Sequence, residues 1–160
     1  MDEKKAEGRI FFKLFNTIGI INQLAGTVFE KSLPDGLKIS QFAVLNHFVR
    51  LGDGATPIRL AHAFQVTKGA MTNTLKRLSD RELITIRPDP DDGRSKRVFI
   101  TEKGRDTREQ CIKNVSPIAA ILGQTFTEDE FADALPFLIK LRDTLDDNRD
   151  LFLSHIDKSS

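Results

Sequence analysis

Hydrophobic residues recur at spacings of three and four along residues 10–29, the period of one face of an α-helix. The turn-forming run SLPDG, residues 32–36, predicts the end of this first helix. A second apolar stripe predicts another helix, with Ser40 as its N-cap and the glycine-containing run 52–55 as its end. The stripes consist of Phe11, Leu14, Phe15, Ile18, Ile21, Leu24 and Val28 in the first helix, and Phe42, Leu45, Phe48 and Val49 in the second.

Two short helices are predicted next. Thr56 is a good N-cap, and Pro57 fits a first helical turn, where its missing N–H does no harm. This helix ends by Gln65, and Thr67 caps the next helix, residues 68–81. Helices joined by about three residues are typical of the helix-turn-helix motif.

Alternating hydrophobic positions then predict two half-buried strands. Ile84 and Ile86 share one face of residues 83–87, and Val98 and Ile100 share one face of residues 96–101. The segment between them is longer than a two-residue hairpin turn, so it should protrude. A helix-turn-helix followed at once by a two-stranded hairpin is a winged helix. The predicted fold class is therefore mainly α with a small β-hairpin.

The C-terminal third is predicted to be helical. Thr101 caps a helix that runs to about residue 115, and Pro117 should break or kink the pattern. The run TEDE, 127–130, is a capping box for a last helix, which Pro136 interrupts. That helix aligns Phe131, Leu135, Leu138, Leu141 and Leu145, and residues 155–160 are expected to form a frayed tail.

At 160 residues, one domain is the default. We expect a winged-helix core at 37–104 and a connecting helix at 105–116. The helices at 1–36 and 117–160 lie outside that core and are rich in Phe and Leu, so they would leave a large apolar patch on a monomer. We interpret the patch as a dimer interface; the alternative is that these residues pack on each other within one chain. The interface residues are Phe11, Phe12, Phe15, Phe131, Leu135 and Phe152.

Charge is distributed unevenly along the chain. Residues 56–105 hold eleven basic and six acidic residues, a net charge of +5, whereas residues 106–160 carry −5 and residues 1–55 carry +1. A basic middle segment indicates a polyanionic partner, although chance clustering on a solvated surface gives the same count.

Several classes of protein are disfavoured by the composition. The single cysteine, Cys111, excludes a disulfide framework and a cysteine-rich zinc site, and the three histidines lack metal-ligand spacing. Neither a nucleophile elbow nor a phosphate-binding glycine loop occurs. No apolar run approaches the length that spans a bilayer, and the first residues lack the features of a secretory signal. We therefore expect a cytoplasmic protein without catalytic residues, metal or cofactor.

The helix at 68–81 has a polar, cationic outward face. At about 100° per residue, Met71, Leu75 and Leu78 face the core. In helix-turn-helix proteins this helix enters the major groove, where Asn pairs with adenine and Lys or Arg contacts guanine or phosphate. The alternative is that the face is polar only because it is exposed to solvent. Gly69 either allows a close approach to DNA or is a tolerated helix defect. The predicted DNA contacts are Lys68, Gly69, Thr72, Asn73, Lys76 and Arg77.

The loop between the strands holds Arg94 at its tip. A cation on a rigid hairpin can enter a narrow minor groove, where the negative potential is strongest. We expect Asp92 to hold the guanidinium by a charge-assisted hydrogen bond and Gly93 to allow a sharp turn. Lys96 and Arg97 lie close enough to contact phosphates. The alternative is a solvated turn whose ion pair contributes little.

Residues 75–105, LKRLSDRELITIRPDPDDGRSKRVFITEKGR, resemble the signature of the MarR family of bacterial transcription regulators. The signature has a strand ending in Arg, then Asp-Pro-x-Asp-x-Arg, then a strand ending in Leu-Thr-x-x-Gly. The matching positions are Arg87, Asp89, Pro90, Asp92, Arg94, Ile100, Thr101 and Gly104, without a gap. Helix order and length also match, so the resemblance covers about the whole chain.

The resemblance implies a homodimer in which each subunit presents one winged helix to half of a pseudo-palindromic operator, with Arg94 in the minor groove. It further implies a repressor that a small, often aromatic or anionic, effector releases from DNA. A pocket is expected among the first, second and fifth helices. The remaining alternative is a winged helix that binds protein instead of DNA, for which the basic face of 68–81 is unsuited.

The sequence departs from the family pattern at several positions. Glu82 stands where a glycine commonly ends the recognition helix, Gly93 replaces a frequent basic residue, and Pro117 and Pro136 interrupt helices that are usually smoother. Some members sense oxidants through a cysteine in the first helix. Cys111 lies elsewhere, and we interpret it as a buried apolar filler.

Overall fold

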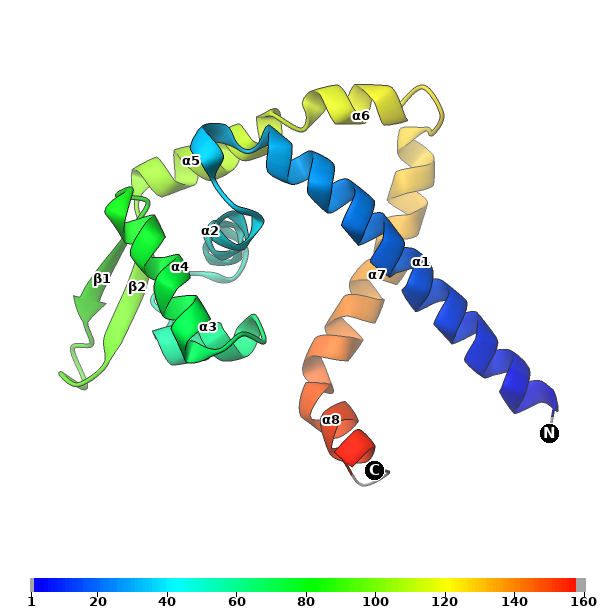
Figure 1. Ribbon diagram of the computed structural model, residues 1–160, viewed down its shortest axis with the longest axis horizontal. Coiled ribbons are helices and arrows are strands. Elements are labelled where there is room, and N and C mark those ends of the chain that lie inside the picture. Colours follow the sequence, from blue (N-terminus) through cyan, green and yellow to red (C-terminus); the bar gives the residue numbers. More distant parts are fainter. Residues whose placement is uncertain (1, 158–160) are drawn as a thin grey trace. The chain divides into compact units, whose positions relative to one another are not determined.

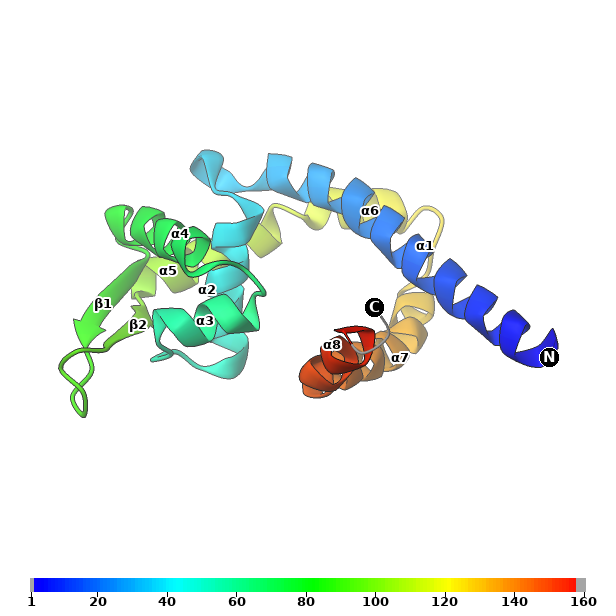
Figure 2. The same cartoon turned by 60° about the horizontal axis from the view of Figure 1, so that its bottom comes forward.

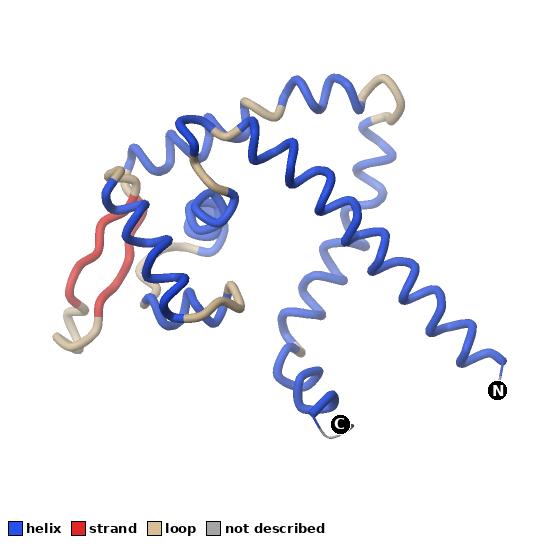
Figure 3. The backbone as a smooth tube through the Cα atoms, viewed as in Figure 1, coloured by secondary structure: helices blue, strands red, loops and turns tan. Residues whose placement is uncertain are grey.

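The structure is a computed structural model that describes residues 2–157. Its elements are α1 (Asp2–Ser32), the 3-10 turn η1 (Pro34–Gly36), α2 (Ile39–Leu51), α3 (Pro57–Ala63), α4 (Lys68–Asp80), β1 (Ile84–Pro88), β2 (Lys96–Ile100), α5 (Glu102–Lys113), α6 (Ser116–Leu122), α7 (Glu128–Asp147) and α8 (Arg149–Asp157) (Figures 1 and 3). The described chain divides between Val115 and Ser116 into two compact units. The predicted order of helices and hairpin is confirmed through α5, and with it the winged helix; the predicted last helix is α7, and α6 and α8 are additional helices.

The core of the first unit lies where α2, α3, α4, α5 and the hairpin meet. The predicted inward face of α4 is confirmed, because Met71, Leu75 and Leu78 are at most 3% exposed. Cys111 of α5 is fully buried, and burial raises the pKa of its thiol. This position agrees with an apolar filler. The core also includes Leu33, Leu37, Val44, Leu45, Phe48, Leu60, Ala61, Leu83, Ile84, Val98 and Ile100.

Threonine side chains cap α3, α4, α5 and α7, as predicted. The Oγ1 atoms of Thr56, Thr67 and Thr101 accept hydrogen bonds from backbone N–H groups three residues on, at 3.0–3.3 Å. The same holds for Thr127, where Glu130 completes the capping box by accepting from the Thr127 N–H at 2.8 Å. Each cap satisfies a donor that the first helical turn would otherwise leave unpaired.

The start of α2 differs from the prediction. Lys38, not Ser40, is the N-cap residue, and its N–H donates to Oε1 of Gln41 at 2.9 Å. Gln41 is itself buried, so a buried polar side chain sets the start of the helix. The face of α2 that is buried therefore differs from the predicted one. It includes Gln41 and Val44, whereas the predicted Phe42 and Val49 are only partly buried.

The two strands pair antiparallel, from Ile84 opposite Ile100 to Pro88 opposite Lys96. Val98 is buried as expected, but Ile86 opposite it is 38% exposed, so its predicted burial is wrong. The reason is the position of the strands. Residues 54–55 hydrogen-bond both the N–H and the carbonyl of Val98, and this covers β2, while β1 is the outer strand. Figure 2 shows the loop of the hairpin projecting beyond the helices of this unit.

The connection from α4 to the hairpin is a Schellman motif. The N–H groups of Glu82 and Leu83 donate to the carbonyls of Ser79 and Leu78 at 2.9 and 3.0 Å. Glu82 has a φ of 61°, the left-handed region that favours glycine. The Schellman motif therefore forms here with a glutamate at the position that favours glycine, and the glutamate adopts the strained conformation itself.

The start of α5 closes on the same junction. The Thr101 Oγ1 donates to the Glu82 carbonyl at 2.8 Å, and the Thr101 N–H donates to the Leu83 carbonyl at 3.1 Å. A Cβ at Gly104 would lie 2.1 Å from the Leu83 carbonyl oxygen, so only glycine fits there. The Thr-x-x-Gly run of the signature thus fixes the hairpin relative to the end of α4.

The second unit consists of α6, α7 and α8. Pro117 lies in the first turn of α6, directly after the predicted break. Pro136 lies inside α7, which continues past it. The expected interruption is therefore wrong, because a proline removes one helical hydrogen bond while the flanking turns keep theirs. Residues 155–157 belong to α8 instead of a frayed tail, and 158–160 lie outside the described residues.

Candidate nucleic-acid interface

The outward face of α4 is exposed along its whole length. The six positions predicted to contact DNA, which are Lys68, Gly69, Thr72, Asn73, Lys76 and Arg77, are all exposed. The Thr72 hydroxyl donates to the Lys68 carbonyl at 2.8 Å. Lys76 forms an ion pair with Asp80 at 2.8 Å. The structure brings these residues onto one surface; their contact with DNA stays a prediction.

A turn with a defined backbone conformation leads from α3 into α4. The turn before it places Gln65 in the left-handed region, with a φ of 52°, and the Val66 N–H donates to the Ala61 carbonyl at 3.0 Å. A Cβ at Gly69 would meet nothing within 4 Å. Packing within the chain therefore does not require glycine at this position.

A buried carboxylate braces the base of the wing loop, residues 89–95. Asp89 is only 8% exposed, and its side chain accepts from Arg97 Nε at 2.8 Å and from the Asp91 N–H at 3.1 Å. Its own N–H donates to the Ser95 carbonyl at 3.0 Å. The Arg97 hydrogen bond, followed by that of Asp91, lowers the pKa of Asp89, and Asp89 raises the pKa of Arg97. Arg97, predicted as a phosphate contact, is thus bound to Asp89.

The tip of the wing loop is shaped by its backbone. Asp92 Oδ1 accepts from the backbone N–H of Arg94 at 3.0 Å, and the Asp92 carbonyl accepts from the Ser95 N–H at 2.8 Å. Asp92 therefore supports the wing through the main chain, which corrects the expected hydrogen bond to the guanidinium. Gly93 is also not required for the turn, because its φ lies outside the left-handed region and a Cβ there would meet nothing. The side chains of Arg94 and Lys96 are exposed.

Sequence reasoning missed two features of the wing. One is the Asp89–Arg97 pair, eight residues apart. The other is Arg87, whose guanidinium lies 5.5 Å from the centre of the Phe99 ring, a cation–π distance. The alternation in both strands was visible in the sequence. The register, which sets Arg87 opposite Arg97 and leaves Asp89 beside Ser95, was not.

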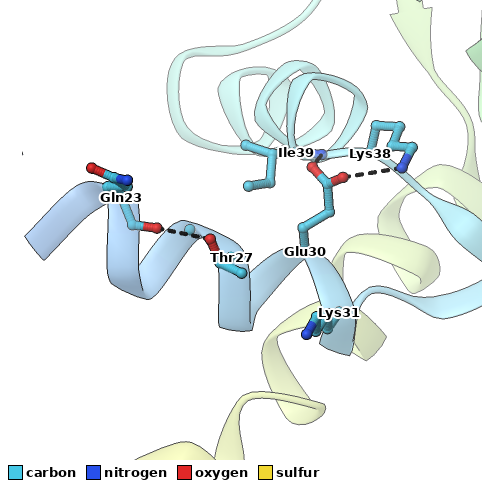
Figure 4. Close-up of a pocket in the computed structure, with 7 residues that line it drawn as sticks. Gln23, Thr27, Glu30, Lys31, Lys38 and Ile39 are labelled. Carbon is cyan, nitrogen blue, oxygen red and sulfur yellow. Dashed lines mark hydrogen bonds and ion pairs between the residues drawn. The ribbon is translucent and has the colours of Figure 1, made fainter. Parts of the chain in front are cut away.

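An open cleft of about 520 Å³ lies between the C-terminal half of α1 and the start of α2 (Figure 4). Glu30 accepts from Lys38 Nζ at 3.0 Å and from the Ile39 N–H at 3.4 Å; the Lys38 hydrogen bond is the main reason that the pKa of Glu30 is lowered. The expected pocket included α5, whereas this cleft is lined by Gln23, Gly26, Thr27, Glu30, Lys31, Lys38 and Ile39.

Two features of the described part of the chain concern metal ions and membranes. Among the side chains that the structure describes, no group of His, Cys, Asp or Glu is placed to hold a metal ion. None of the helices described there combines the length and apolar character needed to cross a membrane.

Comparisons with known proteins give one family. The sequence model of the MarR family matches residues 35–95. The chain is 31% identical over 125 residues to the multiple antibiotic resistance protein MarR of Escherichia coli strain K12, covering 77% of this chain and 85% of that protein. It is 25% identical over 142 residues to the transcriptional activatory protein BadR of Rhodopseudomonas palustris, covering 86% and 78%.

The fold gives the same result. The crystal structure of a mutant MarR from Escherichia coli complexed with operator DNA aligns with a TM-score of 0.65 and 29% identity, over 82% of this chain and 94% of that chain.

Proposed function

The chain belongs to the MarR family of winged-helix transcription regulators, and on that premise we propose that it binds double-stranded DNA sequence-specifically as a homodimer. The observation that carries the proposal is the pairing of two exposed cationic surfaces in one compact unit. One is the outward face of α4, and the other is the wing that ends in Arg94. A polar, basic face of this kind suits duplex DNA and is unsuited to an apolar protein partner.

In this proposal α4 lies in the major groove. Asn73 pairs with an adenine edge, and Lys76 and Arg77 address guanine or phosphate. Lys68, in the first turn, approaches the backbone together with the exposed N–H groups of that turn. Arg94 enters the neighbouring minor groove, and Lys96 contacts phosphates. The brace of Asp89 and Arg97 holds the loop that carries Arg94, so the wing reaches DNA without first having to become ordered.

The proposed dimer uses the helices at 1–36 and 117–160, with 37–104 as the DNA-binding core and 105–116 as the connection. The six predicted interface residues support it, because each remains 42–73% exposed in the single chain: Phe11, Phe12, Phe15, Phe131, Leu135 and Phe152. Exposure of this many large apolar side chains is unusual for a monomer. Light scattering of the purified chain tests it, and a monomer at micromolar concentration would refute it.

We further propose that the protein is a repressor that a small aromatic or anionic effector releases from DNA. The cleft between α1 and α2 is the candidate site, because Glu30 there links the proposed dimerisation helix to the first helix of the core through Lys38 and Ile39. An anionic ligand that takes Lys38 would open this link and change how the two helices meet. A reporter assay distinguishes repression from activation. Activation is the role that the name of BadR gives for that relative.

The central test is selection of bound duplexes from random DNA by the full-length protein. We expect two inverted half-sites whose centres lie about one helical turn apart, roughly 10 base pairs, or a multiple of it. Affinity should fall steeply with salt, since phosphate contacts release counterions. Failure to enrich any sequence, together with no salt-sensitive binding to any duplex, would overturn the proposal.

A further inference from the structure

A carboxylate lies at the C-terminal end of the proposed reading face, in line with the other outward positions of α4. Gly69, Asn73, Lys76 and Asp80 follow one another at intervals of four, three and four residues. Eleven residues at about 100° each bring Asp80 back to within about 20° of Gly69, and opposite the buried Met71. The Asp80 side chain is 57% exposed, and its Oδ2 lies 2.8 Å from Lys76 Nζ. Asp80 is the one carboxylate in the sequence from 68 to 80.

Local stability does not explain this aspartate. Asp80 is the last residue of α4, where the helix dipole favours a cation and disfavours an anion. The ion pair runs from Lys76 to Asp80, the less favourable order for a pair four residues apart. Both side chains are largely exposed, so the pair contributes little to folding. A residue that breaks two local rules without a compensating gain in stability is expected at a functional surface.

We propose that Asp80 is a specificity-determining residue that restrains Lys76; this rests on the proposed function. Non-specific binding depends on phosphate contacts. The negative charge of Asp80 offsets the positive charge of Lys76, so Lys76 attracts a phosphate less strongly. A base pair offers a different partner. Guanine presents acceptors to Lys76, and cytosine N4 presents a donor to Asp80, so a G·C edge satisfies both charges. The pair therefore disfavours the phosphate backbone and favours particular base edges.

The test compares full-length wild type, Asp80→Asn and the control Glu109→Gln. Glu109 lies on α5, and its 54% exposed side chain pairs with Arg108, so its substitution makes the same change in net charge on an element other than α4. Each protein is titrated with the selected operator and with a scrambled duplex of the same length and composition, at several salt concentrations. Thermal unfolding of each variant checks that it folds.

Asp80→Asn should bind the scrambled duplex about fivefold more tightly, the repulsion expected of one unit charge at roughly 4 Å in water. Its salt dependence on that duplex should steepen by about one phosphate equivalent. Operator affinity should change less, so discrimination falls, while thermal stability stays equal or rises. Glu109→Gln should leave both affinities within about twofold.

Three results would overturn the inference: unchanged affinities for Asp80→Asn, an equal gain on both duplexes, or a gain that Glu109→Gln reproduces. A wild-type protein that binds no duplex would overturn the proposed function itself, and the inference with it. The two failures are therefore distinguishable from the wild-type titration alone.

Discussion

Gly104→Ala is the most direct test of how α4, the hairpin and α5 are joined. The added Cβ would lie 2.1 Å from the Leu83 carbonyl oxygen and 2.9 Å from Ile100 Cγ1. Neither neighbour can easily move. The Leu83 oxygen accepts from the Thr101 N–H at 3.1 Å, and Ile100 is in the core. The start of α5 must therefore shift by about 1 Å, away from its two hydrogen bonds to residues 82 and 83.

Three contributions set the expected change in the free energy of unfolding for Gly104→Ala. Overpacking of this kind costs about 1–3 kcal/mol. Strain on the two Thr101 hydrogen bonds adds up to about 1 kcal/mol each. The better helix propensity of alanine returns at most about 1 kcal/mol. We expect a net loss of about 2–3 kcal/mol in the free energy of unfolding.

Urea unfolding followed by circular dichroism at 222 nm measures this loss. Because a dimer is proposed, all variants must be compared at one protomer concentration. Gly69→Ala is the matched control, since it makes the same change near the start of a helix where a Cβ meets nothing. It should be neutral or stabilising by up to about 1 kcal/mol. If Gly104→Ala were as stable as the wild type while the control behaved as expected, the proposed packing at the Leu83 carbonyl would be wrong.

Four further predictions concern the junction and the DNA surface. Glu82→Gly should stabilise the fold by about 0.5–1 kcal/mol in the same urea assay, because glycine adopts the left-handed φ at lower cost; a loss of stability would contradict this. Arg94→Ala should weaken operator binding by about 1–2 kcal/mol in titrations at matched salt without unfolding the dimer, and unchanged affinity would remove the wing from the mechanism. Asn73→Ala should reduce the preference for the operator over random DNA by about 1–3 kcal/mol; equal discrimination would place base reading elsewhere. Since the folded-state pKa of Asp89 is lowered, its contribution to stability should be complete above the unfolded value near 3.9 and lost as pH falls through the lower folded value. The stabilities of wild type and Asp89→Asn should therefore differ at neutral pH and converge below about pH 4, and a difference that stays constant with pH would argue against the brace.

The features that were predictable from sequence are those set within a few residues. Thr67 caps α4 through an N–H three positions on, and the burial of Leu75 follows from a helical period. Features set by distant segments were not predictable. Ile86 alternates correctly, yet it is exposed because residues 54–55 cover the other strand. The burial of Gln41, whose side chain accepts from the Lys38 N–H, was not predictable either, because polarity alone indicates exposure.

The predicted site divides in a similar way. Exposure of Asn73 and Lys76 follows directly from helical geometry, so sequence alone could place them together. The contacts within the wing loop could not be predicted from the sequence, because hydrogen bonds within an irregular loop depend on its exact backbone path. Asp92 was expected to hold a guanidinium and instead binds a backbone N–H, while Asp89, which no pattern singled out as a brace, holds Arg97.

These positions suggest how the family signature and the DNA sequence preference are related. Thr101 and Gly104 join the hairpin to the end of α4, and Asp89 and Asp92 shape the loop that carries Arg94. These four signature residues thus set the shape of the wing and its attachment to α4, which binding to any operator requires. The choice of operator must then depend on residues outside the signature. On the proposed function, those residues are the exposed positions of α4, so exchanging them between relatives should transfer sequence preference while the wing is left unchanged.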